Sequence, residues 1–238
     1  MSNSGEMAKD LKHTHSEYES EIKYLTERLL LMTGRVEQMI ADSIKSLLDR
    51  DKNLAKKVID ADRKVDVDEI EIDEHCIIML AKRQPMASDL RYICLAMKVV
   101  TSLERVADLA TNICERSLEL SDLPQLKPYD DIPRMGRLVE EMLGEVISAM
   151  MERDAEKAVK VIEVDDQIDE LYHQTMRELF ALMRNDENVI DQGIRIQNVA
   201  KYVERMGDNV TNIAEHVVYM VKGKDIRHQV DEEIKLPD

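Results

Sequence analysis

Two segments of this chain carry one sequence pattern, 103 residues apart. RDKNLAKKVIDADRKVD begins at Arg50 and RDAEKAVKVIEVDDQID begins at Arg153, and they share Arg, Asp, Ala, Lys, Val, Ile and two spaced Asp residues. A second phrase recurs 100 residues apart, as ERVADLATNICE from Glu104 and ERMGDNVTNIAE from Glu204. Repetition at nearly the same interval indicates one structural unit that occurs more than once. The chain is therefore constrained to fold as two copies of one unit.

Each copy is predicted to contain three long helices. Apolar residues recur at helical spacing along most of the chain, and only 7 Gly and 5 Pro interrupt it. With no Trp and one Phe, the composition favours packed helices over sheets. We therefore predict an all-α fold of two tandem three-helix-bundle repeats, with six long antiparallel helices. The predicted helices are about 17–49, 53–83, 88–120, 134–152, 155–184 and 188–221.

The boundaries follow from polar, Pro and Gly positions. Asn53 and Ser88 are predicted N-caps, Pro85 marks a turn, and Gly223 is expected to stop the last helix. The predicted organisation is a flexible N-terminal segment 1–16, a first repeat 17–121, a Pro-containing linker 122–133, a second repeat 134–222 and a C-terminal tail 223–238.

Charge and cysteine content exclude several classes of protein. The net charge of −16 argues against nucleic acid and against an anionic membrane surface as partners. The N-terminus lacks the apolar core of a signal peptide, and no stretch approaches the roughly 20 apolar residues of a membrane span. The three cysteines include no CxxC pair, as expected for reduced thiols. A cytoplasmic location is expected.

The third predicted helix of each repeat gathers oxygen-bearing side chains on one face. On a helical wheel, Glu, Asp, Thr, Asn and Glu of each phrase fall within a sector about 100° wide, opposite the apolar stripe. This sector contains no basic residue in either copy, although like charges at i,i+4 are unfavourable unless something neutralises them. One such helix would be an ordinary solvated face. The repetition favours a functional role.

The second predicted helix of each repeat adds a D-x-x-x-D pair beside apolar neighbours. An antiparallel helix pair could set this D-x-x-x-D against the E-x-x-x-D of the next helix. That would gather four carboxylates in each repeat. The candidate metal-binding residues are Asp62, Asp66, Glu104 and Asp108 in the first repeat, and Asp165, Asp169, Glu204 and Asp208 in the second.

Oxygen-only clusters of this kind suit hard cations such as Mg, Mn, Ca or iron. Whether Asn112, Asn212, Glu115 and Glu215 join these sites stays open. A ferritin-like di-iron site would need Glu-x-x-His in both repeats, and Glu170-x-x-His173 occurs once. A metal-dependent hydrolase or oxidase using the clustered carboxylates remains an alternative, as does a purely structural helical scaffold.

These motifs resemble those of the PhoU family of phosphate uptake regulators. The resemblance rests on LERVADLATNICE, on YVERMGDNVTNIAEHVVYMVKGKDIRH and on RQPMASDLRYI at 83–93, and it extends from about residue 17 to 230. The second repeat departs from the pattern, because NVIDQGIR stands where the first has PMASDLR.

The resemblance implies a function that spacing alone does not. It implies a non-enzymatic cytoplasmic protein that negatively regulates phosphate-starvation signalling and phosphate uptake. The implied partners are the ATPase subunit of the phosphate ABC transporter, a phosphate-sensing membrane histidine kinase and a second copy in a homodimer. It also implies that the D-x-x-x-D and E-x-x-x-D motifs named above bind metal, with Mg, Mn or Fe as the expected ions.

Overall fold

The computed structural model describes residues 3–127 and 129–226, with side chains described from residue 17 onward. These residues form six α-helices and one short 3-10 helix, which confirms the predicted all-α fold with two repeats. The elements are α1 (Asn3–Asp49), α2 (Lys52–Arg83), α3 (Ala87–Leu120), α4 (Asp131–Glu152), α5 (Ala155–Asn185), η1 (Glu187–Val189) and α6 (Ile190–Lys222).

The repeated RD dipeptide makes the same turn in both halves. Arg50 and Arg153 each adopt a positive φ of 55°, which ends α1 and α4. The following aspartates then cap the next helices, because Asp51 accepts from the backbone N–H groups of Asn53 and Leu54 at 2.9 and 3.0 Å. Asp154 caps α5 in the same way. The prediction that Asn53 is an N-cap is therefore wrong, since it donates to the cap.

Two other predicted helix starts also need correction. Met86 precedes α3 without a side-chain cap, and its carbonyl accepts from the Asp89 N–H at 3.1 Å, so Ser88 is not the N-cap. α4 starts at Asp131 instead of 134. Proline is tolerated in the first turn of a helix, because the backbone N–H that Pro133 lacks would have no partner there. Pro85 lies in the α2–α3 turn, and Gly223 ends α6 at a φ of 69°, both as predicted.

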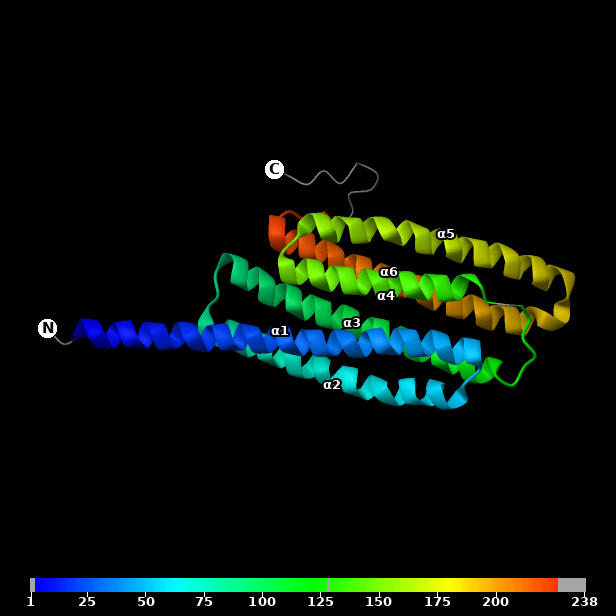
Figure 1. Cartoon of the computed structure of the whole chain (residues 1–238), viewed down its shortest axis with the longest axis horizontal. Coiled ribbons are helices and arrows are strands. Elements are labelled where there is room, and N and C mark those ends of the chain that lie inside the picture. The colour runs from blue at the N-terminus through cyan, green and yellow to red at the C-terminus, as the bar shows by residue number, and fades with distance from the viewer. Residues whose placement is uncertain (1–2, 128, 227–238) are drawn as a thin grey trace.

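The N-terminal helix is longer than predicted. α1 begins at Asn3, whereas the predicted helix begins near Glu17 and leaves 1–16 as a flexible segment. Residues 3–16 contain no proline, so no residue there removes a backbone donor from the helix. Figure 1 shows this part of α1 extending past the ends of the other helices. Of the predicted C-terminal tail 223–238, residues 227–238 lie outside the described residues.

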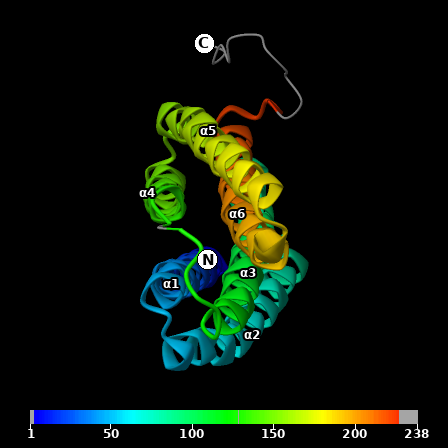
Figure 2. The same ribbon diagram turned by 90° about the vertical axis from the view of Figure 1, so that its right-hand side faces the viewer.

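The two repeats pack together through their third and first helices. α3 lies against α6 and α1 lies against α4, while α2 and α5 occupy the two outer positions (Figure 2). Gly136 on α4 permits this approach, since a Cβ built there would lie 2.9 Å from Cγ1 of Ile44 on α1. One continuous hydrophobic core runs through both repeats, including Ile40 and Val100 of the first and Leu143 and Val210 of the second.

A buried carboxylate lies between α1 and α2, at a position that the second repeat fills with an apolar residue. Asp68 is 2% exposed and accepts from Arg28 at 2.7 Å and from Arg35. At the matching position of the second repeat stands Leu171, which is also buried. At this one position the helix pair is therefore held by a charged network in the first repeat and by an apolar side chain in the second.

None of the helices, over their described residues, is long and apolar enough to cross a membrane.

Candidate functional site

The first acidic cluster lies between α2 and α3. The antiparallel packing of these helices brings Asp62 and Asp66 of α2 near Glu104 and Asp108 of α3, close enough for their charges to interact. Asp62 and Glu104 are half-buried, whereas Asp66 and Asp108 are exposed. The predicted gathering of four carboxylates is thus present, with half of the set partly withdrawn from water.

Burial and mutual repulsion shift the acidity of this cluster. Burial and the charges of Asp66 and Asp108 raise the pKa of Asp62 to about 6. Burial, Asp108 and the acids of α2 raise the pKa of Glu104 to about 7. Both shifts show that the ionised forms lack sufficient positive charge around them. An ordinary solvated face would not produce them.

The first cluster contains two carboxylates that the sequence pattern did not predict. Glu69 and Asp73 continue the series of acids along α2, and Glu69 interacts with Asp73, Asp66 and Glu104. Burial is the largest cause that raises the pKa of each. The signal was their spacing, because 62, 66, 69 and 73 follow one helix face at i+3 and i+4 intervals. Tyr172 and Met176 stand at the matching positions of the second repeat, so Glu69 and Asp73 are not part of the repeated pattern.

The second acidic cluster lies between α5 and α6. Burial, Asp208 and Asp169 raise the pKa of Asp165 to about 7, and Glu204 contributes. Burial and Glu204 also raise the pKa of Asp208. The four predicted acids of this repeat are therefore brought together as well. Gly207 makes room for them, since a Cβ there would lie 2.7 Å from Oδ1 of Asp165.

Replacing Gly207 with alanine should displace the Asp165 carboxylate. Alanine favours a helix by about 1 kcal/mol over glycine, and this gain opposes the cost of the close contact with Asp165. The free energy of unfolding should therefore change little, although the second cluster is distorted. Thermal unfolding of the metal-free variant, followed by titration with Mn²⁺, measures both effects. The matching residue of the first repeat is already Ala107, and Ala107→Gly serves as the control. Unchanged Mn²⁺ affinity in Gly207→Ala would contradict a role for Asp165.

A lysine distinguishes the second cluster from the first. Lys201 forms an ion pair with Oε1 of Glu204, and its Nζ lies 5.3 Å from the centre of the Tyr172 ring. Thr101 stands at the matching position of the first repeat. Lys201 lies three residues before Glu204, outside the repeated phrase but within the same sector of the helical wheel. The prediction that this sector contains no basic residue is therefore wrong for the second copy. The second cluster therefore has an internal cation, and the first cluster is more strongly acidic.

The donor atoms suit a hard cation, but the side chains do not yet form a closed metal site. Among the described side chains, no group of three or more His, Cys, Asp or Glu residues is arranged to hold a metal ion. Oε2 of Glu204 is buried without a hydrogen-bond partner, and the hydroxyls of Thr111 and Thr211 lie near Asp62 and Asp165. The unpaired oxygen and the raised pKa values fit a cation that would require the carboxylates to rotate inward. The metal assignment of the eight acids stays a prediction.

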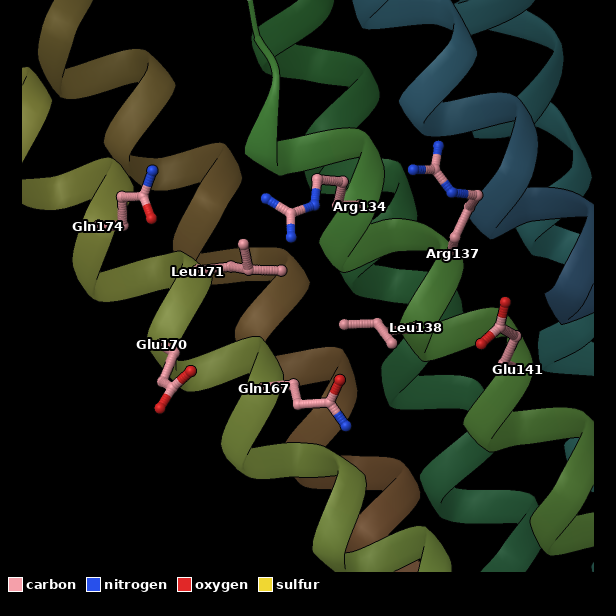
Figure 3. A pocket seen from close by; sticks show the side chains of 8 residues that line it. All are labelled: Arg134, Arg137, Leu138, Glu141, Gln167, Glu170, Leu171 and Gln174. Atoms are coloured by element: carbon pink, nitrogen blue, oxygen red, sulfur yellow. The ribbon is translucent and has the colours of Figure 1, made fainter.

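A hollow of about 360 Å³ lies on a different surface, between α4 and α5. In Figure 3, Arg134 and Leu138 point toward α5, whereas Arg137 and Glu141 point away from it. Its lining residues combine two arginines with two glutamates. The hollow therefore favours neither sign of charge.

The fold and the two clusters define a class of all-α proteins in which each three-helix repeat carries carboxylates between its second and third helices. The PhoU domain matches residues 29–117 and again 132–217, and the chain belongs to the PhoU family. The two matched ranges correspond to the two repeats.

Similar proteins support this membership over nearly the whole chain. The chain is 34% identical over 223 residues to the phosphate-specific transport system accessory protein PhoU of Escherichia coli K12, covering 94% of this chain and 92% of that one. It is 40% identical over 217 residues to the PhoU homolog of Rhizobium meliloti, covering 90% and 91%. The crystal structure of PhoU from Pseudomonas aeruginosa is similar, with a TM-score of 0.84, 35% identity and coverage of 87% and 100%.

Proposed function

We propose that this protein is a non-enzymatic regulator of phosphate uptake and of phosphate-starvation signalling. The observation that carries the proposal is the similarity, over 91% and 94% of this chain, to proteins named as accessories of a phosphate-specific transport system. The two clusters at matching places in the repeats support a role for these acidic faces.

The proposed partners are the ATPase subunit of a phosphate ABC transporter and a phosphate-sensing membrane histidine kinase, in a cytoplasmic setting. A homodimer is proposed as the working form. The negative charge of the chain, −16, would steer it toward basic surfaces of such partners.

We also propose that Mg, Mn or Fe binds the acidic clusters. A cation would supply the positive charge that Asp62, Glu104 and Asp165 lack, and a carboxylate-only donor set suits these ions. Such an ion would order each acidic face as a fixed surface for a partner. The residues that would hold it are Asp62, Asp66, Glu104 and Asp108, and Asp165, Asp169, Glu204 and Asp208.

Complementation tests this function directly. A strain lacking its own phosphate regulator should express phosphate-starvation genes constitutively, and the intact chain should restore repression in phosphate-rich medium. A chain with Glu104→Gln and Asp108→Asn should restore repression poorly, because the first cluster loses two negative charges. The control is a chain with Glu163→Gln and Glu170→Gln. Both glutamates are exposed on α5 and lie outside the clusters.

Three outcomes separate the hypotheses. Failure of the intact chain to restore repression would contradict the regulatory role. Full activity of the Glu104/Asp108 variant would contradict a role for the first cluster while leaving the regulator intact. Turnover of phosphate esters by the purified chain, lost in the same variant, would instead support the hydrolase alternative.

A further inference from the structure

A second kind of site lies between the first two helices. A groove of about 190 Å³, here called the basic groove, runs between α1 and α2. Its lining residues are Arg35, Gln38, Met39 and Asp42 of α1, and Lys57, Val58, Ala61 and Lys64 of α2. It therefore has three cationic side chains, one acid and an apolar floor, in a chain whose net charge is −16.

The guanidinium in this groove is fixed in place. Arg35 bonds through Nη1 to the buried Asp68, which also accepts from Arg28. The Arg35 side chain is nevertheless 39% exposed, so N–H groups on its other edge can meet a ligand. A guanidinium that is already oriented loses less conformational entropy when it binds an anion.

The two lysines of the groove are unengaged. Lys57 and Lys64 are both exposed, and neither ammonium group forms an ion pair or a hydrogen bond with a side chain in the described part of the chain. They lie about two turns apart on α2, and Arg35 lines the same groove from α1. Three cationic side chains from two helices thus line one hollow. Asp68 offsets the charge of Arg35, and Asp42 is the single acid in the lining itself.

The second repeat provides an internal comparison. Its matching groove, of about 270 Å³, contains Glu141, Met142, Glu145, Lys157, Lys160, Val161 and Val164. Leu138 and Gln167 replace Arg35 and Lys64 there. Lys157 is already paired with Glu145 at 3.1 Å. The repeated architecture supplies the hollow in both halves, whereas the excess of cations occurs only in the first.

We propose that the basic groove binds a phosphate group. A planar guanidinium matches the geometry of phosphate oxygens, and lysine ammonium groups add point charges around a dianion. A monocarboxylate carries a single negative charge, so three cationic side chains should bind it less tightly than a phosphate dianion. The hollow is of a size for one small oxyanion, and its open rim would admit the terminal phosphate of a larger molecule. The site is separate from the acidic clusters and does not depend on metal there.

Calorimetric titration of the full chain, stripped of metal, tests the site with inorganic phosphate, inorganic triphosphate and acetate at low and physiological salt. Saturable binding of at least one phosphate compound is expected, weakening as salt rises, with acetate much weaker. Lys57→Gln or Lys64→Gln should each weaken binding about tenfold, since each removes one charge-assisted contact. Tighter binding of triphosphate than of inorganic phosphate would identify the source as a phosphate carried on a larger molecule.

The control variants are Lys160→Gln, which matches Lys57 in the second repeat, and Glu104→Gln in the first acidic cluster. Neither should change phosphate affinity. Absence of saturable binding by wild type, equal binding of acetate, or an equal loss in Lys160→Gln would overturn the proposal. A loss in Glu104→Gln alone would also overturn it, because the anion would then lie at the acidic cluster.

Discussion

Replacing Asp68 with asparagine should lower the free energy of unfolding by about 3 kcal/mol. Asp68 is buried and offsets the charges of Arg28 and Arg35, so its neutralisation leaves two guanidiniums at the α1–α2 contact without their shared carboxylate. Denaturant unfolding monitored by circular dichroism measures this change. For a chain of 238 residues, it corresponds to a fall of roughly 6–12 °C in melting temperature.

Two further variants isolate the cause. Asp66→Asn, an exposed change two residues away, should be neutral or slightly stabilising because it relieves like-charge repulsion. Asp68→Leu combined with Arg35→Leu copies Leu171 and Leu138 of the second repeat and should recover most of the loss, since Arg28 keeps its ion pair with Glu71. A change below about 1 kcal/mol in Asp68→Asn would contradict the network's role.

The second large effect concerns pH and metal together. The metal-free protein should lose stability as pH rises from 5 to about 8. Asp62, Glu104 and Asp165 have folded-state pKa values of about 6, 7 and 7, above the ordinary values near 4 of an unfolded chain. The folded state therefore binds more protons in this window, and a rise in pH favours the unfolded state. After allowance for solvent screening of these half-exposed groups, the loss is roughly 1–2 kcal/mol.

Added metal should reverse this loss. At pH 8 the carboxylates are ionised, and Mg²⁺ or Mn²⁺ that binds the folded state stabilises it by about 2.7 kcal/mol at a hundredfold excess over Kd. Thermal unfolding at pH 5 and pH 8, with and without metal, measures both effects. Glu104→Gln should reduce the pH-dependent loss and the metal-induced gain together, whereas Glu163→Gln, an exposed acid outside the clusters, should change neither.

Stability that stays level or rises between pH 5 and pH 8 would contradict the raised pKa values. A pH-dependent loss that no metal reverses would support the strained clusters but contradict the metal assignment.

The sequence by itself determined the repeated unit, the all-α class and the central acids of both clusters. These features depend on local spacing, because an i,i+4 pair such as Glu104 and Asp108 shares a helix face whatever surrounds it. The position of Gly223 likewise predicts the end of α6 through its own backbone preference. The family resemblance rests on the same repeated phrases, and these are visible in the order of residues without any tertiary contact.

Only the tertiary structure decided how unlike the two halves are. In the sequence, Asp68 is one more acid on α2, and its burial depends on two arginines of α1, 33 and 40 residues away. Glu69 joins the first cluster only because α3 packs beside it, and Lys57 becomes part of a groove only because α1 supplies Arg35. Helix periodicity determines which residues share a face. The packing of one helix on another decides what that face meets, and whether its charges are offset.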